Sequence, residues 1–494
     1  MKRLFIRAIA LALTFASAPR PTLAAEPVPT DSAEETESET QDDEDEDDEG
    51  LRQRLTERED KRRPLKPFEV EVGGRLLTLG GEWEVEFLEL RRWVVGEQID
   101  EPDRRLLSQG LELEAFYTFG KPLSIFAQIQ LAMEEDLLPE SQDEVSDQWL
   151  QREEMWITSE DISGSGVSVE AGRLDFEDDR RWWWDDELDA VRVIYERGPV
   201  ELQVAFAREV APRRSDLSFV EPEHDRIARW IGELSWDFQP DHALEIFALH
   251  QDDRSRTERV GTVIDTDRED EPDSQLLWLG ARVMGAFELG APGLLGYWLD
   301  GATVDGHEHW TEYEEISDDQ SEVTSVTRRH VDGWALDVGF SWLPPLEWEP
   351  RVFAGYALAS NEFRQSGIQA NEAGFGGVER FGHYGFLLDP ELSNLEIWTG
   401  GLGCSLWRSS SLDLVYHQYR LRQASTELWD AELELELTGD SRALGREVDL
   451  VLALEDWERL EFTFALAAFW PGRALGHQSG RTSYGTFLAM RLAF

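Results

Sequence analysis

Apolar and polar side chains alternate along most of the chain between residues 83 and 494. In the segment 123–131, apolar side chains occupy every odd position, and Ser124, Gln128 and Gln130 lie on the other face. The segments 201–206 and 447–454 repeat the pattern. A period of two predicts β-strands, here about ten residues long.

The connectors between these segments alternate in length. Eight short connectors lie near 119–122, 160–164, 198–199, 238–241, 288–291, 344–347, 407–410 and 456–459, and nine long ones near 93–108, 134–147, 175–187, 208–226, 252–274, 304–331, 361–393, 421–445 and 471–481. Outer-membrane barrels have tight periplasmic turns, long extracellular loops and an even number of strands. The pattern therefore predicts an all-β fold, an 18-stranded antiparallel transmembrane β-barrel over residues 67–494. Its apolar faces should point outward to lipid and its polar faces inward to water.

The two ends of the chain fit export to the outer membrane. Lys2, Arg3 and Arg7 precede an apolar run and a small-residue site at Ala24 and Ala25, which predicts a signal peptide over residues 1–25. At the other end, apolar side chains alternate down to a terminal Phe494, which resembles the assembly signal of outer-membrane barrels. Several of the 20 tryptophans fall near predicted strand ends, where interfacial girdles would place them: Trp83, Trp93, Trp156, Trp230, Trp236, Trp342 and Trp470.

Residues 26–66 lack apolar periodicity. Residues 26–50 hold 14 acidic side chains and no Lys or Arg, whereas 51–66 hold seven basic and three acidic ones. Neither stretch can bury apolar surface, so we expect a disordered periplasmic segment. Residues 67–78 alternate enough to form either an extra strand or a periplasmic plug.

The net charge of −55 belongs mainly to the barrel. The signal, acidic and mixed segments carry +4, −14 and +4, so residues 67–494 retain −49. Such a surface excludes nucleic acid as a partner. Cys404 is the single cysteine, which leaves no disulfide framework.

No nucleophile–base pair stands out among the nine histidines, so we expect no enzymatic activity. We expect no cofactor either. The stretch 252–274 carries nine acidic side chains and four arginines, and such acidic loops could bind Ca²⁺ weakly through carboxylate oxygens.

The densest cluster of charges and aromatic rings lies in residues 171–193, AGRLDFEDDRRWWWDDELDAVRV. Charged side chains at a constriction set the selectivity of a pore. An ordinary extracellular loop is the other interpretation of this segment. The predicted pore residues are Arg152, Arg173, Asp178, Asp179, Arg180, Arg181, Asp185, Asp189 and Arg380.

This cluster resembles the strand–loop–strand of the alginate-export outer-membrane porin family. Further similar stretches are REEMWI (152–157), GYALAS (355–360), FRQSGIQAN (363–371), FGHYGFLLDPELSNL (381–395), LDLVYHQYR (412–420), GREVDLVL (445–452) and FWPG (469–472). The resemblance runs from about residue 80 to the C-terminus. It implies an 18-stranded barrel through which an anionic uronate polysaccharide leaves the periplasm.

By the same resemblance, Arg152 and Arg173 match pore-wall arginines, Asp185 matches a pore aspartate, and Arg380 falls in a basic pore segment. Other positions depart from the family pattern, since Glu114, Asp175 and Thr463 stand where that pattern has basic residues. Family membership therefore does not by itself make alginate the cargo.

Two functions remain open at this stage. The first is a passive channel for an exported polysaccharide. The alternative is a general or cation-selective porin for small solutes, favoured by the acidic lumen candidates Glu112, Glu114, Asp175 and Asp179. The expected partners are outer-membrane lipid, the transported polysaccharide or solute, and periplasmic secretion proteins, with the chain acting as a monomer.

Overall fold

The computed structural model describes residues 68–95, 103–120, 122–138, 146–222, 224–253, 259–269, 272–317, 320–346, 348–375, 377–378, 381–407, 409–429, 431–478 and 481–494. The expected signal peptide, the segment 26–66 and Arg380 lie outside these residues.

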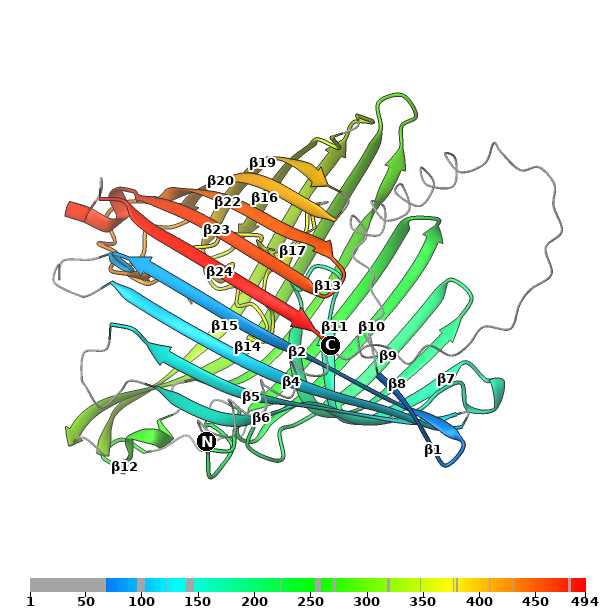
Figure 1. Ribbon diagram of the computed structural model, residues 1–494. Coiled ribbons are helices and arrows are strands. Elements are labelled where there is room, and N and C mark those ends of the chain that lie inside the picture. The colour runs from blue at the N-terminus through cyan, green and yellow to red at the C-terminus, as the bar shows by residue number, and fades with distance from the viewer. Residues whose placement is uncertain are drawn as a thin grey trace.

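Eighteen strands form one closed antiparallel barrel (Figure 1). They are β2 (Arg75–Arg91), β4 (Arg104–Gly120), β5 (Leu123–Asp136), β6 (Asp147–Ser159), β7 (Val167–Glu177), β8 (Asp185–Arg197), β9 (Val200–Ala207), β10 (Ile227–Gln239), β11 (His242–Asp253), β13 (Pro272–Glu288), β14 (Leu294–Ser317), β15 (Gln320–Leu343), β16 (Arg351–Ala359), β19 (Leu395–Trp407), β20 (Ser410–Leu421), β22 (Ala443–Trp457), β23 (Leu460–Pro471) and β24 (Ser483–Ala493). The barrel closes where β2 pairs with β24, from Glu82 opposite Ala493 to Arg91 opposite Tyr484. The predicted fold class is confirmed.

The faces of the strands are inverted relative to a soluble protein. On β11, Ile246 is exposed on the outside, whereas Glu245 and Phe247 are buried inside. On β22, Glu447 and Asp449 are buried in the interior, and Val448 and Leu450 point outward. Since lipid covers the outside of such a barrel, the alternation read from the sequence has apolar side chains outward and polar ones inward.

One connector differs from the expectation, and the structure decides between the two alternatives for residues 67–78. The stretch 304–331 was predicted as a long loop, and that prediction is wrong, because β14 and β15 stay paired, through two register shifts, as far as Ser317 opposite Gln320. Its polar, β-branched sequence extends the hairpin beyond the barrel wall, where neither face needs to be apolar. For 67–78 the strand alternative holds: β1 (Phe68–Val72) pairs with the first residues of β2.

The smaller elements lie in the connectors between the barrel strands. They are β3 (Val94–Val95), β12 (Val263–Asp265), β17 (Glu372–Ala373), β18 (Phe381–Gly382), β21 (Glu434–Leu435) and the 3₁₀-helices η1 (Ile162–Gly164), η2 (Thr266–Arg268) and η3 (Arg473–Gln478). None of the helices within the described ranges has the length and apolar character needed to cross a membrane.

The tryptophans divide between the two faces. Trp230, Trp236 and Trp342 are exposed on the outside, as an interfacial girdle requires. Trp156 is instead buried inside, stacked obliquely near Phe126. Sequence position near a strand end could not separate these cases, because either face of the barrel offers an apolar site.

Candidate functional site

The outer ends of β7 and β8 leave the barrel wall. Pairing of β7 with β6 stops at Arg173 opposite Met155, and pairing of β8 with β9 stops at Ala190 opposite Ala207. Beyond these points the two strands pair only with each other, up to Glu177 opposite Asp185. The hairpin is therefore free of the wall on both edges.

The segment after β9 closes the gap that the hairpin leaves. The Arg152 amide donates to the Arg213 carbonyl (2.9 Å), and the Ser215 amide donates to the Leu150 carbonyl (2.9 Å). Residues 213–215 thus pair with the outer end of β6 in place of β7.

The tip of the hairpin packs deep in the barrel. Trp182, Trp183 and Trp184 are almost fully buried. Trp183 stacks on Phe247 of β11 with ring centroids 4.8 Å apart. Three consecutive tryptophans gain most by leaving water, which explains why this loop turns inward.

The connector between β16 and β19 meets the tip inside the barrel. The Arg181 carbonyl accepts the amides of Ala370 (3.1 Å) and Asn371 (2.9 Å), and the Ser366 hydroxyl donates to the Trp183 carbonyl (2.5 Å). Residues 178–184 and 361–394 together are called the clasp below.

The clasp is tied to the opposite wall as well. Trp182 Nε1 donates to the Tyr384 hydroxyl (2.7 Å), and the Tyr419 hydroxyl of β20 donates to the Tyr384 carbonyl (2.6 Å). On β22, the Glu447 carboxylate accepts the amides of Leu387 (2.6 Å) and Leu388 (3.1 Å). The clasp therefore bridges the interior from β11–β15 to β20–β22.

An inner charge network anchors the tip to β13, β14 and β15. Arg282 is fully buried and reaches Asp178 (Nη1–Oδ1 2.5 Å), Asp300 (Nε–Oδ1 2.5 Å) and Glu245 (Nη1–Oε2 3.2 Å). Arg180 pairs with Asp300 and lies 3.5 Å from Asp337. Its guanidinium also sits 4.7 Å from the centroid of the Trp298 ring. Buried charges require such partners, because desolvating a lone charge costs several kcal/mol.

A second charge network holds the base of the hairpin. Arg152 forms a two-pronged pair with Asp189, with Nη2–Oδ2 at 3.0 Å. Arg173, only 2% exposed, contacts Glu187 (3.1 Å) and Glu209 (3.3 Å). These pairs lie between the hairpin and the segment that follows β9.

Of the remaining predicted residues, Arg181 and Asp179 belong to the clasp, and Asp185 begins β8 beside it. Arg181 contacts Glu177 (3.0 Å), Asp185 (3.3 Å) and Glu372 (2.7 Å). Asp179 is close enough to Arg282 to interact with it electrostatically. The structure thus brings eight of the nine predicted pore residues into one hairpin and its supports, and the ninth, Arg380, lies outside the described residues.

Burial shifts the titration of two groups in the clasp. Burial and the neighbouring Arg180 guanidinium lower the pKa of His383 well below its ordinary value. Its Nε2 donates to the Arg180 carbonyl (2.8 Å), and this hydrogen bond offsets part of the lowering, because it also favours the charged ring. Burial alone would lower the pKa of Arg180, but Asp337 and Asp300 raise it.

Sequence reasoning missed the wall partners Arg282, Asp300 and Asp337. Each is a charged position whose immediate neighbours on the strand are apolar or small, as for Arg282 in LLWLGARVMGAF (276–287). A lone charge on the inward face of such a strand is the signal that could have found them.

A different part of the interior is rich in acid. Inward positions of β2, β4 and β6 carry Glu82, Glu84, Glu86, Glu112, Glu114 and Glu154. Arg491 reaches this wall from β24, with Nε 2.6 Å from Glu84. We call these six glutamates the acidic wall.

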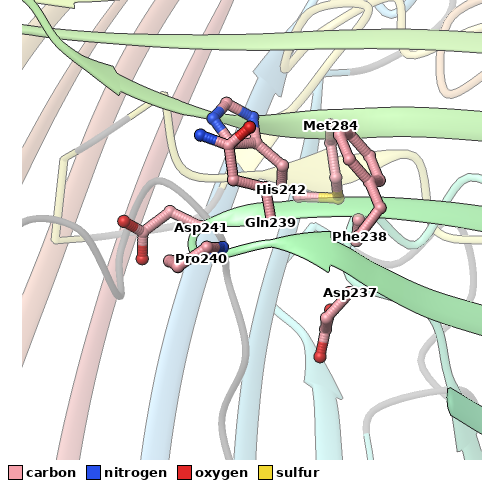
Figure 2. Close-up of a pocket in the computed structure, with 9 residues that line it drawn as sticks. Asp237, Phe238, Gln239, Pro240, Asp241, His242 and Met284 are labelled. Carbon is pink, nitrogen blue, oxygen red and sulfur yellow. The ribbon is translucent and has the colours of Figure 1, made fainter. Parts of the chain in front are cut away.

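A cavity of about 460 Å³ lies away from both networks, at the short turn between β10 and β11 (Figure 2). His242, Phe238 and Met284 line it. His242 Nδ1 lies 3.0 Å from the Tyr297 hydroxyl. Ala243 and Met284, which line it, belong to the same buried apolar cluster as Phe375 and Phe381 of the clasp. Among the described residues, no group of three His, Cys, Asp or Glu side chains is arranged to hold a metal ion.

Comparison with known proteins agrees with this architecture. The sequence is 24% identical over 314 residues to the alginate production protein AlgE of Pseudomonas aeruginosa, covering 62% of this chain and 63% of that protein. It is 23% identical over 391 residues to AlgE of Pseudomonas syringae pv. tomato, covering 76% and 78%. The chain thus aligns with somewhat less than two thirds of the P. aeruginosa relative.

The fold is similar to solved Pseudomonas aeruginosa outer-membrane proteins. OccK8 (OprE) superposes with a TM-score of 0.53 at 11% identity, over 85% of this chain and 98% of that one. OccK5 (OpdH) gives 0.52 at 9% identity, over 85% and 98%. At these identities the likeness concerns the fold alone. The profile of the "Alginate export" family matches residues 90–488, which include the acidic residues of β4 and β6, both charge networks and the clasp, and this chain belongs to that family.

Proposed function

We propose that the protein is an outer-membrane channel that exports an acidic polysaccharide of the alginate type through the barrel. Transport is passive, since the outer membrane supplies no nucleotide, and the chain acts as a conduit and not as a catalyst. Support comes from the family match, which spans both charge networks and the clasp, and from the names of the two relatives.

The observation that carries the proposal is the clasp. Its buried arginines and carboxylates lie across the interior, where a polymer would have to pass. Because the tip contacts β11–β15 and residues 384–388 contact β20 and β22, a chain of sugars can pass only after the clasp has moved. Separation of the pairs would then expose Arg180 and Arg282 to the carboxylates of the polymer.

The test is a planar-bilayer measurement on the purified barrel under a salt gradient, with oligouronate added to one side. Block of the current by oligouronate, and not by an uncharged oligosaccharide of equal length, is the expected result. Equal effects of the two sugars would contradict an acidic cargo.

The acidic wall favours a second candidate, conduction of small cations. Its six glutamates outnumber the arginine that reaches them, and excess carboxylates concentrate cations in a narrow passage. A reversal potential of cation sign, with no block by oligouronate, would favour this candidate over polysaccharide export.

A further inference from the structure

The β14–β15 hairpin continues beyond the lipid-facing surface. On its outer side, Trp342 and Trp334 are exposed eight positions apart along β15. Eight residues of a tilted strand rise by about 20 Å, close to the height of an apolar band with its two aromatic girdles. The outer face beyond Trp334 therefore lies outside the bilayer, on the side of the long connectors.

Three histidines share this outer face. His307 lies directly opposite His330, and His309, two positions along β14, lies opposite Arg328. The rings of His307 and His309 are 6.0 Å apart between centroids. Residues directly opposite in an antiparallel pair have Cβ atoms about 5 Å apart, so two imidazoles there can reach one ion.

The His330 ring is already oriented as a ligand would be. Its Nδ1 lies 2.6 Å from the Gly306 carbonyl oxygen. A carbonyl oxygen only accepts hydrogen bonds, so Nδ1 carries the proton and Nε2 carries the lone pair in the neutral ring. Metal-binding histidines generally fix their tautomer in this way, by donating the other ring N–H to a carbonyl or carboxylate. His330 is exposed, which leaves Nε2 accessible.

The surrounding charge favours a cation. Asp305 lies opposite Asp332 in the row next to the His307–His330 pair. On the other side of β14, Asp273 of β13 pairs with His309. Among the described residues of this register, these three carboxylates outnumber the one guanidinium, that of Arg328, which opposes them at His307.

We infer that His307 and His330 form a chelating pair for late first-row divalent cations such as Cu²⁺, Ni²⁺ and Zn²⁺, with His309 as the nearest additional ligand. Imidazole nitrogen suits these ions. Cu²⁺ should bind most tightly, and Ni²⁺ and Zn²⁺ should bind more weakly. Since no three-ligand group is preformed within the described residues, water completes the coordination. A bound ion would link the two strands of the hairpin outside the membrane.

The test uses barrel refolded without a histidine tag, titrated with Cu²⁺ and followed by calorimetry and electron paramagnetic resonance. The expected result is one site whose spectrum shows coupling to two or more imidazole nitrogens. His307→Ala and His330→Ala should each lower the affinity about tenfold or more. His250→Ala is the matched control, an exposed histidine on β11, which β13 separates from the hairpin, and should leave the affinity unchanged.

Heat-modifiable gel migration shows that each variant is folded. Wild-type binding without nitrogen coupling, or an unchanged affinity in folded His307→Ala, would overturn the inference. An equal loss of affinity in His250→Ala would also overturn it, because binding would then be spread over surface histidines.

Discussion

The two sides of the barrel interior differ in how their charged side chains are paired. Along β2–β6 the acidic wall carries glutamates in excess, and the arginine that meets them, Arg491, is 40% exposed at its side chain. Along β11–β15 each buried arginine is surrounded by carboxylates and covered by the clasp. Excess charge is tolerated where water reaches it, whereas a buried charge needs a partner. Selectivity for small ions should therefore arise on the first side and closure on the second.

The largest expected effect is on stability, when an arginine is replaced by alanine on each side of the barrel interior. Arg282→Ala leaves Asp178, Asp300 and Glu245 without their shared cation and should destabilise the folded barrel by about 3–5 kcal/mol. Arg491→Ala, on the hydrated side, should cost about 1 kcal/mol or less. Urea unfolding monitored by tryptophan fluorescence measures both. Equal losses would abolish the distinction between the two sides.

The next largest effect tests whether the clasp closes the channel. Tyr384→Phe removes the acceptor for Trp182 Nε1 and the donor to Asp337, whose bond measures 2.9 Å. Leaving these buried groups unsatisfied should cost about 1–3 kcal/mol. We expect more frequent channel openings in single-channel recordings, with unchanged ion selectivity. Tyr416→Phe is the control, because this tyrosine is exposed on the outer face of β20. An unaltered open probability in Tyr384→Phe would exclude the clasp as the closing element.

Acidification should weaken the clasp through His383. Burial and Arg180 lower the pKa of this histidine in the folded state, so the unfolded or released segment binds the proton more readily. The stabilisation is therefore complete above the ordinary histidine pKa of about 6.5 and is lost as the pH falls below it. Open probability should rise between pH 7.5 and 5, and His383→Gln should flatten this dependence. If the pH dependence of the open probability persists in His383→Gln, it arises from other groups, such as the carboxylates of the inner network.

The acidic wall should control ion preference more than conductance. Replacing Glu112 and Glu114 together with glutamine should lower the cation-to-anion permeability ratio by a factor of about two to five, since each charge contributes of order one kT to the local potential. The reversal potential in a salt gradient measures this ratio. Glu71→Gln, at an exposed position of β1, serves as the control. No change in the double variant would place the selectivity on the clasp instead.

The smallest effect is expected from the N-terminal segment. Removing residues 26–66 while keeping the signal peptide should leave folding, insertion and ion preference unchanged, because this stretch lacks apolar periodicity and the barrel retains its own negative charge. Heat-modifiable migration and the reversal potential check the two parts of this prediction. A lost heat shift would show that the segment is needed for assembly.

Much of the fold could be predicted because local sequence patterns specify the strands and turns of a barrel. Period-two alternation specifies each strand, and connector length specifies which end faces the periplasm. The stretch 304–331 failed for a physical reason: outside the bilayer a hairpin needs no apolar face, so its polar strands read as a loop.

Local sequence patterns predicted only part of the candidate site. The cluster 171–193 stood out through its charge and aromatic content, and its seven predicted residues, with Arg152 of β6, lie in the hairpin or its supports. Their partners Asp300 and Asp337 lie more than 100 positions away, each between apolar or small neighbours on its strand. Local sequence carries no record of which distant charges will meet.

By itself, the sequence determined the number and facing of the strands, the outer-membrane destination and the family, because these depend on periodicity, turn length and local motifs. Only the tertiary structure decided that Trp182, Trp183 and Trp184 fold inward and that residues 361–394 meet them across the interior. Alternation specifies which face a side chain occupies. Where a hairpin leaves the wall is decided by the burial and ion pairing that the completed barrel makes available.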